Sequence, residues 1–360
     1  PEIHTDGSFT LTMDNSQFQY LAVDETEDLS FTYQVEDADG DTETATITVT
    51  VTGVNDAPIA RELSSETLEE DSVRVQAVFA DTDIDATDDV DVTAVTQDAQ
   101  GGLFTFENDH IEFDPQDDFI YLAFGESTTV TTTYTITDEH GASDTHSWSV
   151  EVIGQNGAPV AVNDSTTITE DEDISGFNLL SNDWDPDASD VISLVSLAQP
   201  SKGESVLESS SEGTVGFNTG SDFDYLNVGD SITLTMDYDI EDDTEAAVTG
   251  TDTGQFSITI TGVNDGPVAN MDIASVSESG SVNITVLDND TDVDQNATLS
   301  LVSAKVVYGG GSVSLDGNEV VFNTNGDFEN LALGQTGEAV IEYVMEDEHG
   351  AQSTSAAFVQ

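Results

Sequence analysis

One short phrase recurs along the chain and constrains its fold more than any other feature. Gly-Xaa-Asn-Asp-Xaa-Pro occupies residues 53–58 and 262–267, and a degenerate copy, Gly-Gln-Asn-Gly-Ala-Pro, occupies residues 154–159. The copies begin 101 and 108 residues apart. A linker that recurs at such intervals indicates a tandem array of similar modules rather than one large domain.

The segments between the linkers have the pattern of β-strands. Residues 44–51 and 256–260 alternate polar with apolar side chains and are rich in Thr, Val and Ile. This period of two is typical of strands with one buried face. Asp, Asn and Gly interrupt such runs about every ten residues, and no stretch has helical periodicity with caps. We therefore predict an all-β chain of tandem antiparallel β-sandwich modules arranged end to end.

Each copy carries the same markers in the same register. A leucine precedes a tyrosine by twelve residues and an acid follows that tyrosine by four: Leu21, Tyr33, Asp37; Leu122, Tyr134, Asp138; Leu226, Tyr238, Asp242; Leu331, Tyr343, Asp347. The register predicts a C-terminal half-module at residues 1–52, modules at 58–153 and 159–261, and a module lacking the end of its last strand at 267–360. We expect the tyrosines to be buried, the half-module to pack poorly or pair irregularly, and four inserted residues to lengthen a hairpin in the third copy.

The charge balance excludes several classes of partner. The chain has 74 acidic and 4 basic residues and a formal net charge of −70, so it should repel nucleic acid and anionic membranes and attract cations. Its 37% hydrophobic content, arranged in alternating runs, argues against a disordered acidic chain. There is no cysteine and no apolar run of membrane-spanning length. Adaptation to high salt is an alternative reason for the charge, and the abrupt ends suggest an excerpt of a longer protein.

Acidic clusters follow each linker at a fixed distance. Asp-Xaa-Asp-Xaa-Asp runs begin at Asp81, Asp183 and Asp290, each 25 or 26 residues after the fourth linker position, which is Asp56, Gly157 or Asp265. An acidic pair or its remnant lies between linker and run, at residues 70–71, 170–171 and 278–279. Crowded carboxylates repel one another unless a cation lies among them, and oxygen ligands without cysteine suit calcium better than zinc. Each run alone could be a solvated turn, but recurrence in three modules favours calcium.

Other polar and aromatic residues have simpler interpretations. The acids Asp37, Asp138 and Asp347 stand in Gly-containing turns that form hairpins without an ion, and a role as direct metal ligands is the alternative. We expect His140 and His349 to cap such turns rather than to bind a ligand. Trp148 and Trp184 could offer a surface to a sugar, but burial in the core is the more economical interpretation of each.

Several segments resemble known repeat families. Residues 121–127 and 223–231 resemble a signature of VCBS repeats, and residues 133–141, with the linker that follows, are similar to the C-terminal half of that family. Residues 178–187 resemble bacterial cadherin-like repeats. The resemblance implies Ig/cadherin-like β-sandwiches in a large RTX-type surface adhesin of a Gram-negative bacterium, exported by type I secretion, with Ca²⁺ at or near the module junctions.

By matching positions, the resemblance also implies the metal ligands at each linker. They are Asn55, Asp56, Glu70, Asp71, Asp81, Asp83 and Asp85 at the first; Asn156, Glu170, Asp171, Asp183, Asp185 and Asp187 at the second; Asn264, Asp265, Glu278, Asp290, Asp292 and Asp294 at the third. Two positions depart from the pattern, because Gly157 replaces the linker aspartate and Ser279 the second acid of the pair. The first linker keeps every expected ligand, so we expect it to be the stiffest.

These features predict a non-enzymatic extender region of a secreted or cell-surface adhesin, stiffened by calcium and supporting cell adhesion or biofilm formation. Its partners would be calcium ions and neighbouring modules, with glycans or another cell surface engaged through other regions, and with neither nucleic acid nor membrane insertion. Carbohydrate-binding cadherin-like modules of an extracellular protein are the alternative, weakened by the presence of only two Trp. An enzyme is disfavoured because acids repeated across modules indicate structural roles.

Overall fold

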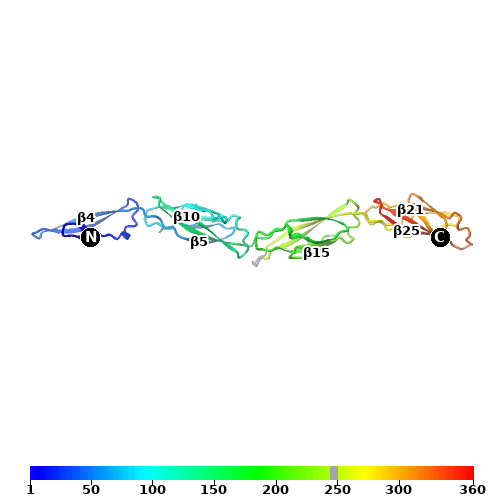
Figure 1. Cartoon of the computed structure of the whole chain (residues 1–360), viewed down its shortest axis with the longest axis horizontal. Helices are drawn as coiled ribbons and strands as arrows, with labels where there is room; N and C mark the ends of the chain where they lie inside the picture. Colours follow the sequence, from blue (N-terminus) through cyan, green and yellow to red (C-terminus); the bar gives the residue numbers. More distant parts are fainter. Residues whose placement is uncertain (81, 244–249) are drawn as a thin grey trace. The chain divides into compact units, whose positions relative to one another are not determined.

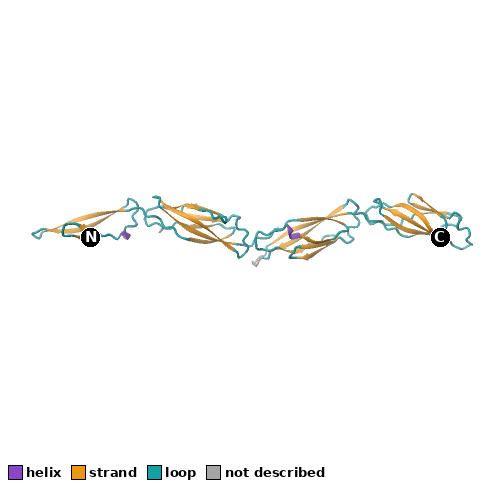
Figure 2. Cartoon of the chain, viewed as in Figure 1, coloured by secondary structure: helices purple, strands orange, loops and turns teal. Residues whose placement is uncertain are grey.

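The computed structural model describes residues 1–80, 82–243 and 250–360. Nearly all of its regular elements are strands, and the helical ones described are the short 3-10 helices η1 (Asn15–Gln17) and η2 (Leu179–Ser181) (Figure 2). The chain divides into two compact units. The first comprises residues 1–158, 185–191 and the described ends of 243–250, and the second comprises residues 159–184, 192–242 and 251–360. The predicted all-β class is confirmed.

The second module is a sandwich of two sheets, in the orders β5-β11-β10-β7 and β6-β9-β8 (Figure 1). Its strands are β5 (Leu63–Leu68), β6 (Val73–Gln76), β7 (Val90–Val95), β8 (Leu103–Glu107), β9 (His110–Asp114), β10 (Ser127–Asp138) and β11 (Ser143–Ile153). β5 runs parallel to β11, whereas the other pairs are antiparallel. Alternate residues are buried from Val130 onward in β10 and from Trp148 to Val152 in β11. Trp148, fully buried, packs edge-on against Phe104 at 5.6 Å between ring centroids.

The third module repeats this topology, with sheets β12-β18-β17-β14 and β13-β16-β15. Its strands are β12 (Asp164–Thr169), β13 (Ile174–Asn178), β14 (Ser193–Leu197), β15 (Glu204–Ser209), β16 (Thr214–Asn218), β17 (Ser231–Glu241) and β18 (Thr251–Thr261). Here β12 is the strand that runs parallel to its partner, β18. The expected four-residue insertion follows β17 and lies outside the described residues.

The fourth module has sheets β19-β25-β24-β21 and β20-β23-β22. Its strands are β19 (Asp272–Ala274), β20 (Ser281–Ile284), β21 (Ser300–Tyr308), β22 (Ser312–Asp316), β23 (Glu319–Asn323), β24 (Ala339–Glu346) and β25 (Gln352–Val359). Again the first strand, β19, is parallel to the last, β25. One parallel pair per module was not predicted. Because the two strands run in the same direction, the first strand ends at the same end of the sandwich as the last strand.

The first module consists of two hairpins. β1 (Glu2–Ile3) pairs with β2 (Phe9–Thr10), and β3 (Thr26–Glu36) pairs with β4 (Thr42–Thr52) in an unbroken antiparallel register. Leu21 and Ala22 are its only described hydrophobic residues that are buried. Packing is therefore sparse, as expected, but the pairing of β3 with β4 is regular rather than irregular.

The linker glycines are required because another part of the backbone lies against them. A Cβ added to Gly53, Gly154 or Gly262 would lie 2.2–2.4 Å from two carbonyl oxygens of the preceding module. The leucine marker residue contributes one of those oxygens in each case. Each glycine N–H also donates to a carbonyl near that leucine, from Gly53 to Glu25 at 2.8 Å in the first module. The recurring leucine and glycine are thus two sides of one contact.

The aromatic predictions had mixed outcomes. Tyr134, Tyr238 and Tyr343 are fully buried, which confirms them as core residues. The equivalent Tyr33 is only half-buried, in a module with few buried hydrophobic residues. Trp148 is buried as expected. The prediction for Trp184 is wrong, since its side chain is 52% exposed beside the acidic run.

Candidate metal centres at the linkers

Each acidic run is folded back on itself and fastened to the linker. The third aspartate of the run donates its backbone N–H to the second: Asp85 to Asp83 at 3.0 Å, Asp187 to Asp185 at 2.9 Å, and Asp294 to Asp292 at 3.0 Å. Its carboxylate then accepts the backbone N–H of the linker residue after asparagine, which is Asp56, Gly157 or Asp265, at 2.8–3.1 Å. Because that donor is a backbone group, glycine at position 157 preserves the contact.

The hairpin between the last two long strands supplies another acid. Asn55 Nδ2 donates to Asp138 Oδ2 at 2.9 Å, and Asn264 Nδ2 donates to Asp347 Oδ2 at 2.8 Å. Burial acts to raise the pKa of Asp138, but hydrogen bonds from Asn55 and from backbone N–H groups of the turn outweigh it and lower the pKa below its usual value. The same balance lowers the pKa of Asp347. Both carboxylates are therefore held ionised beside the linker.

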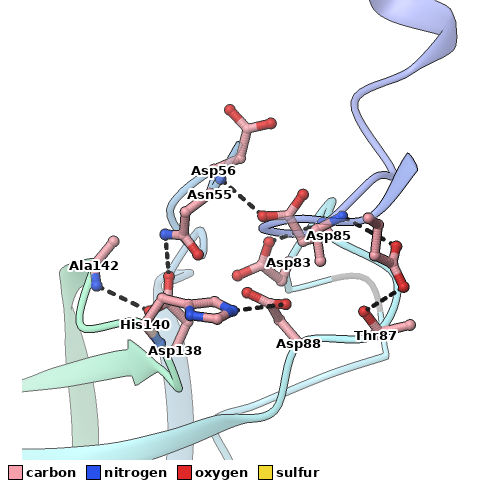
Figure 3. Close-up of polar contacts among 11 residues, drawn as sticks. Asn55, Asp56, Asp83, Asp85, Thr87, Asp88, Asp138, His140 and Ala142 are labelled. Atoms are coloured by element: carbon pink, nitrogen blue, oxygen red, sulfur yellow. Dashed lines mark hydrogen bonds and ion pairs between the residues drawn. The ribbon is translucent and has the colours of Figure 1, made fainter. Parts of the chain in front are cut away.

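The first centre gathers carboxylates that face one another. Ligand oxygens of Asp83, Asp88 and Asp138 lie within 4.8 Å of one another (Figure 3). Among the described residues, no hydrogen bond reaches the buried oxygens Asn55 Oδ1, Asp83 Oδ2, Asp85 Oδ1 and both of Asp88. Burial, aided by the neighbouring carboxylates, raises the pKa of Asp83 and of Asp88. Buried carboxylates without hydrogen bonds are costly, so this arrangement favours a cation or a proton among them.

The third centre has the same character and includes a glutamate from the preceding module. Ligand oxygens of Glu170, Asp265 and Asp294 lie within 4.8 Å of one another. Glu170 is 1% exposed and accepts the N–H of Val263 at 2.8 Å through Oε1. Its Oε2, together with Asn264 Oδ1 and one oxygen each of Asp265, Asp292 and Asp294, is buried and lacks a hydrogen bond from any described residue. Burial raises the pKa of all three clustered acids.

The second centre brings together Asp185, Asp187 and Asp190, again within 4.8 Å. The buried Glu69 accepts the N–H of Gln155 at 3.3 Å. Burial first, and then the charge of Asp187, raise the pKa of Glu69 to about 7. Asn156 borders a hollow together with Glu69 and Glu70.

The acidic pairs do not lie beside the linkers at which the sequence predicts them. Glu70 and Asp71 were predicted beside Asn55, but Glu70 lines the hollow at residues 154–157, and Asp71 N donates to Leu68 O at 3.1 Å in the adjoining turn. Glu170 belongs to the third centre instead of the second, and Asp171 lies close enough to raise the pKa of Asp265.

Glu278 also lies away from the linker at which it was predicted. It lines a cavity of about 690 Å³ with Phe328 and Gln360, far along the fourth module from Asn264. The cause is the parallel strand pair: the first strand of each module ends beside the end of its last strand, and so beside the following linker. The expectation that the first linker is the stiffest rests on its keeping every expected ligand. Two of those ligands, Glu70 and Asp71, lie beside the following linker instead.

The first aspartates of the runs also have another role. Asp183 and Asp290 accept hydrogen bonds from the buried hydroxyls of Tyr238 and Tyr343, each at 3.1 Å. Each also accepts a backbone N–H, from residues 162 and 270, at 2.6 Å. They fasten the run to the core and belong to none of the described carboxylate groups. Asp81, the equivalent residue at the first linker, lies outside the described residues.

Several site residues were missed in the sequence. Glu69, Glu170 and Glu278 all stand eleven residues after a linker proline, a register that would have identified Glu69 in place of Glu70. Asp88 and Asp190 stand three residues after the first and the second run. Asp138 forms the hairpin turn that the sequence predicts, and its carboxylate also faces the first centre, in line with the alternative interpretation of this acid.

Figure 3 shows the carboxylate of Asp56 pointing away from Asp83 and Asp138. The residues predicted and found together are Asn55, Asp83 and Asp85; Asp185 and Asp187; Asn264, Asp265, Asp292 and Asp294. Asn156 adjoins the second set through Gly157, whose N–H binds Asp187.

The fold and these centres define an array of Ig/cadherin-like β-sandwich modules. The model of the bacterial Ig domain matches residues 2–50, 55–151 and 156–259, and that of the bacterial cadherin-like domain matches residues 264–360. The chain therefore belongs to the bacterial Ig domain family, and its last module is bacterial cadherin-like. Such domains are typical of extracellular, non-enzymatic proteins.

Solved structures with the same fold are cadherin ectodomains. The protocadherin γB2 domains 1–5 match with TM-score 0.52 and 12% identity over 99% of this chain and 70% of that one. The protocadherin γB4 extracellular domain matches with TM-score 0.50 and 13% identity over 99% of this chain, which spans 58% of that structure. Human CDH23 EC21-23 matches with TM-score 0.50 and 13% identity over 85% of this chain and 100% of that one.

At these identities the likeness concerns the fold alone. No curated protein sequence matches the chain. In the part of the chain that the structure describes, no helix is both long and apolar enough to cross a membrane.

Proposed function

We propose that this chain is a non-enzymatic extender segment of a secreted or cell-surface bacterial protein, and that calcium ions occupy the linker centres. The observation that carries the proposal is the set of buried carboxylate and amide oxygens without hydrogen bonds at the first and third centres. Calcium accepts six to eight oxygen ligands in flexible geometry. The charge it supplies would neutralise the clustered acids of the third centre, Glu170, Asp265 and Asp294.

The donor sets fit this ion. The first centre offers Asn55, Asp83, Asp85, Asp88 and Asp138; the second Glu69, Asn156, Asp185, Asp187 and Asp190; the third Glu170, Asn264, Asp265, Asp292 and Asp294. All these donors are oxygens, the hard ligands that calcium prefers over softer metals.

The sources of the ligands support a stiffening role. Glu170 directly follows β12, the first strand of the third module. Asp265 belongs to the linker, and Asp294 belongs to the fourth module. The Tyr225 carbonyl of the third module also accepts the N–H of Gln295 at 3.0 Å. An ion held by all three segments would resist bending at the linker, because bending would separate ligands from it.

Calcium affinity would make this stiffening depend on location. Extracellular calcium modules bind with a Kd of roughly 10⁻⁴–10⁻³ M, so the centres would be empty in the cytosol and filled outside the cell. We propose on this basis, and on the VCBS resemblance, that the parent protein is an RTX-type adhesin of a Gram-negative bacterium that leaves by type I secretion. The modules proposed at 58–153, 159–261 and 267–360 would hold an adhesive region away from the cell.

Thermal unfolding in calcium and then in chelator tests the proposal, with magnesium as the control for general screening of charge. We expect calcium to raise the Tm of the modules well beyond the effect of magnesium. An identical Tm in calcium and chelator would refute the proposal.

The exposed ring of Trp184 is the one observation that favours carbohydrate binding as a second candidate. A glycan array probed with the chain and with its Trp184→Ala variant tests it. Binding that requires Trp184 would support this function, and an array without a binder would dispose of it.

A further inference from the structure

Asp88 is the least compensated acid at the first centre. Its side chain is only 1% exposed, and neither carboxylate oxygen receives a hydrogen bond from a described residue. It belongs to two groups at once: with Asp83 and Asp138 on one side, and with Glu139 and His140 on the other. In each group the ligand atoms lie within 4.8 Å of one another.

The spacing between His140 and Asp88 is that of two metal ligands. His140 Nε2 lies 3.7 Å from Asp88 Oδ1 (Figure 3), which is longer than a hydrogen bond of about 2.7–3.2 Å. Two ligands about 2.0–2.2 Å from one tetrahedral zinc ion are separated by about 3.3–3.6 Å. An ion could therefore lie between the two side chains with little movement of either.

The backbone fixes His140, and solvent reaches its ring. The His140 N–H donates to Asp138 Oδ1 at 2.9 Å, inside a turn that the Ala142 N–H also fastens to the same oxygen. The side chain is 35% exposed, so an ion can approach from solvent while Asp88 holds the inner side.

We propose that Asp88, Glu139 and His140 form a second divalent metal site, selective for a borderline transition-metal ion such as Zn²⁺, beside the oxygen-only centre. The imidazole nitrogen makes the difference, because it suits zinc, whereas carboxylate and amide oxygens alone suit calcium. Three protein ligands leave the fourth position of a tetrahedral ion for water. Asp88 has an oxygen for each site and would bridge them. The inference goes beyond the proposed function and holds whether or not calcium binds next to it.

The other modules lack one member of the set. The fourth module keeps Glu348 and His349, but Ala297 stands where the second module has Asp88. The third module keeps Asp190, but no histidine follows Asp242 in its hairpin. The sequence therefore contains its own controls, and we expect one zinc site per chain.

Isothermal titration of the whole chain with ZnCl₂, in calcium sufficient to saturate the linker centres, tests the proposal. We expect one zinc site, and we expect His140→Gln to weaken it by at least the roughly 10–100-fold that loss of an outer-shell partner costs a metal site. His349→Gln should leave the titration unchanged. Ala297→Asp should create a second site in the fourth module.

The wild-type chain binding no zinc, or His140→Gln binding it as wild type does, would overturn the proposal and leave a simple His140–Asp88 ion pair. The Tm of each variant in calcium and chelator separates this failure from failure of the calcium proposal, since the His140 ring is outside the oxygen-only centre. If His140→Gln does not fold, the NMR resonances of the imidazoles decide the matter. Zinc should shift those of His140 in the wild-type chain, and unshifted resonances would refute the site.

Discussion

Replacement of Glu170 by glutamine should have opposite effects with and without calcium. In chelator, Glu170 is a buried carboxylate whose pKa is raised by burial and by the charges of Asp265 and Asp294. Glutamine keeps the shape and the acceptor for the Val263 N–H, but removes the repulsion. The apo variant should therefore unfold at the same temperature as the wild type or at a higher one.

In calcium the sign reverses, because the variant loses a charged ligand. An ion present at 100 times its Kd stabilises the folded state by about 2.7 kcal/mol. A tenfold loss of affinity removes about 1.4 kcal/mol. For a domain of this size, about 1 kcal/mol shifts the Tm by about 4–8 °C. Glu170→Gln should accordingly lower the Tm in calcium by about 5–10 °C.

Differential scanning calorimetry in calcium and in chelator measures both effects. Glu278→Gln is the matched control, since Glu278 holds the same position after its linker proline but lies away from the third centre. It should change neither Tm by more than a degree or two. A Glu170→Gln variant that loses equal stability in both conditions would refute the reasoning. That result would mean that Glu170 only accepts a structural hydrogen bond and binds no ion.

Three further predictions concern pH, the linkers and the exposed tryptophan. Burial raises the pKa of Glu69 to about 7 and that of Asp272 to about 6; raised carboxyl pKa values stabilise the folded state when the groups are protonated. The Tm in chelator should therefore rise as pH falls from 8 to 5, whereas the increment from calcium should shrink as its ligands are protonated. The Cβ of Gly262→Ala would meet backbone oxygens at 2.2–2.4 Å, so this variant should lose about 1–3 kcal/mol of unfolding free energy in a denaturant titration. The control Gly266→Ala, whose Cβ would be 3.7 Å from its nearest neighbour, should lose almost none. Trp184→Ala should change the unfolding free energy by no more than about 0.5 kcal/mol, because its side chain is 52% exposed; a larger loss would show that the ring packs against the sandwich.

The all-β fold class, the modular repeat and the acidic runs could be predicted from the sequence because each depends on residues that are close together in the chain. Alternation of side chains reports one buried face of a strand, as in β10, where the buried Tyr134 lies between the exposed Thr133 and the partly exposed Thr135. The run geometry is equally local: Asp85 folds back on Asp83 through a hydrogen bond spanning two residues.

Only the tertiary structure decided which linker each acid serves. Glu69 and Glu170 follow a linker in the chain, yet a parallel strand pair carries each to the far end of its module and beside the next linker. Asp183 has the same local sequence as the other acids of its run, but a buried hydroxyl from a strand some fifty residues away, that of Tyr238, turns it toward the core. The sequence by itself determined what kinds of ligand the chain offers and how often. Long-range strand pairing decided which of them meet, since the spacing of neighbouring residues does not record which distant strands pair.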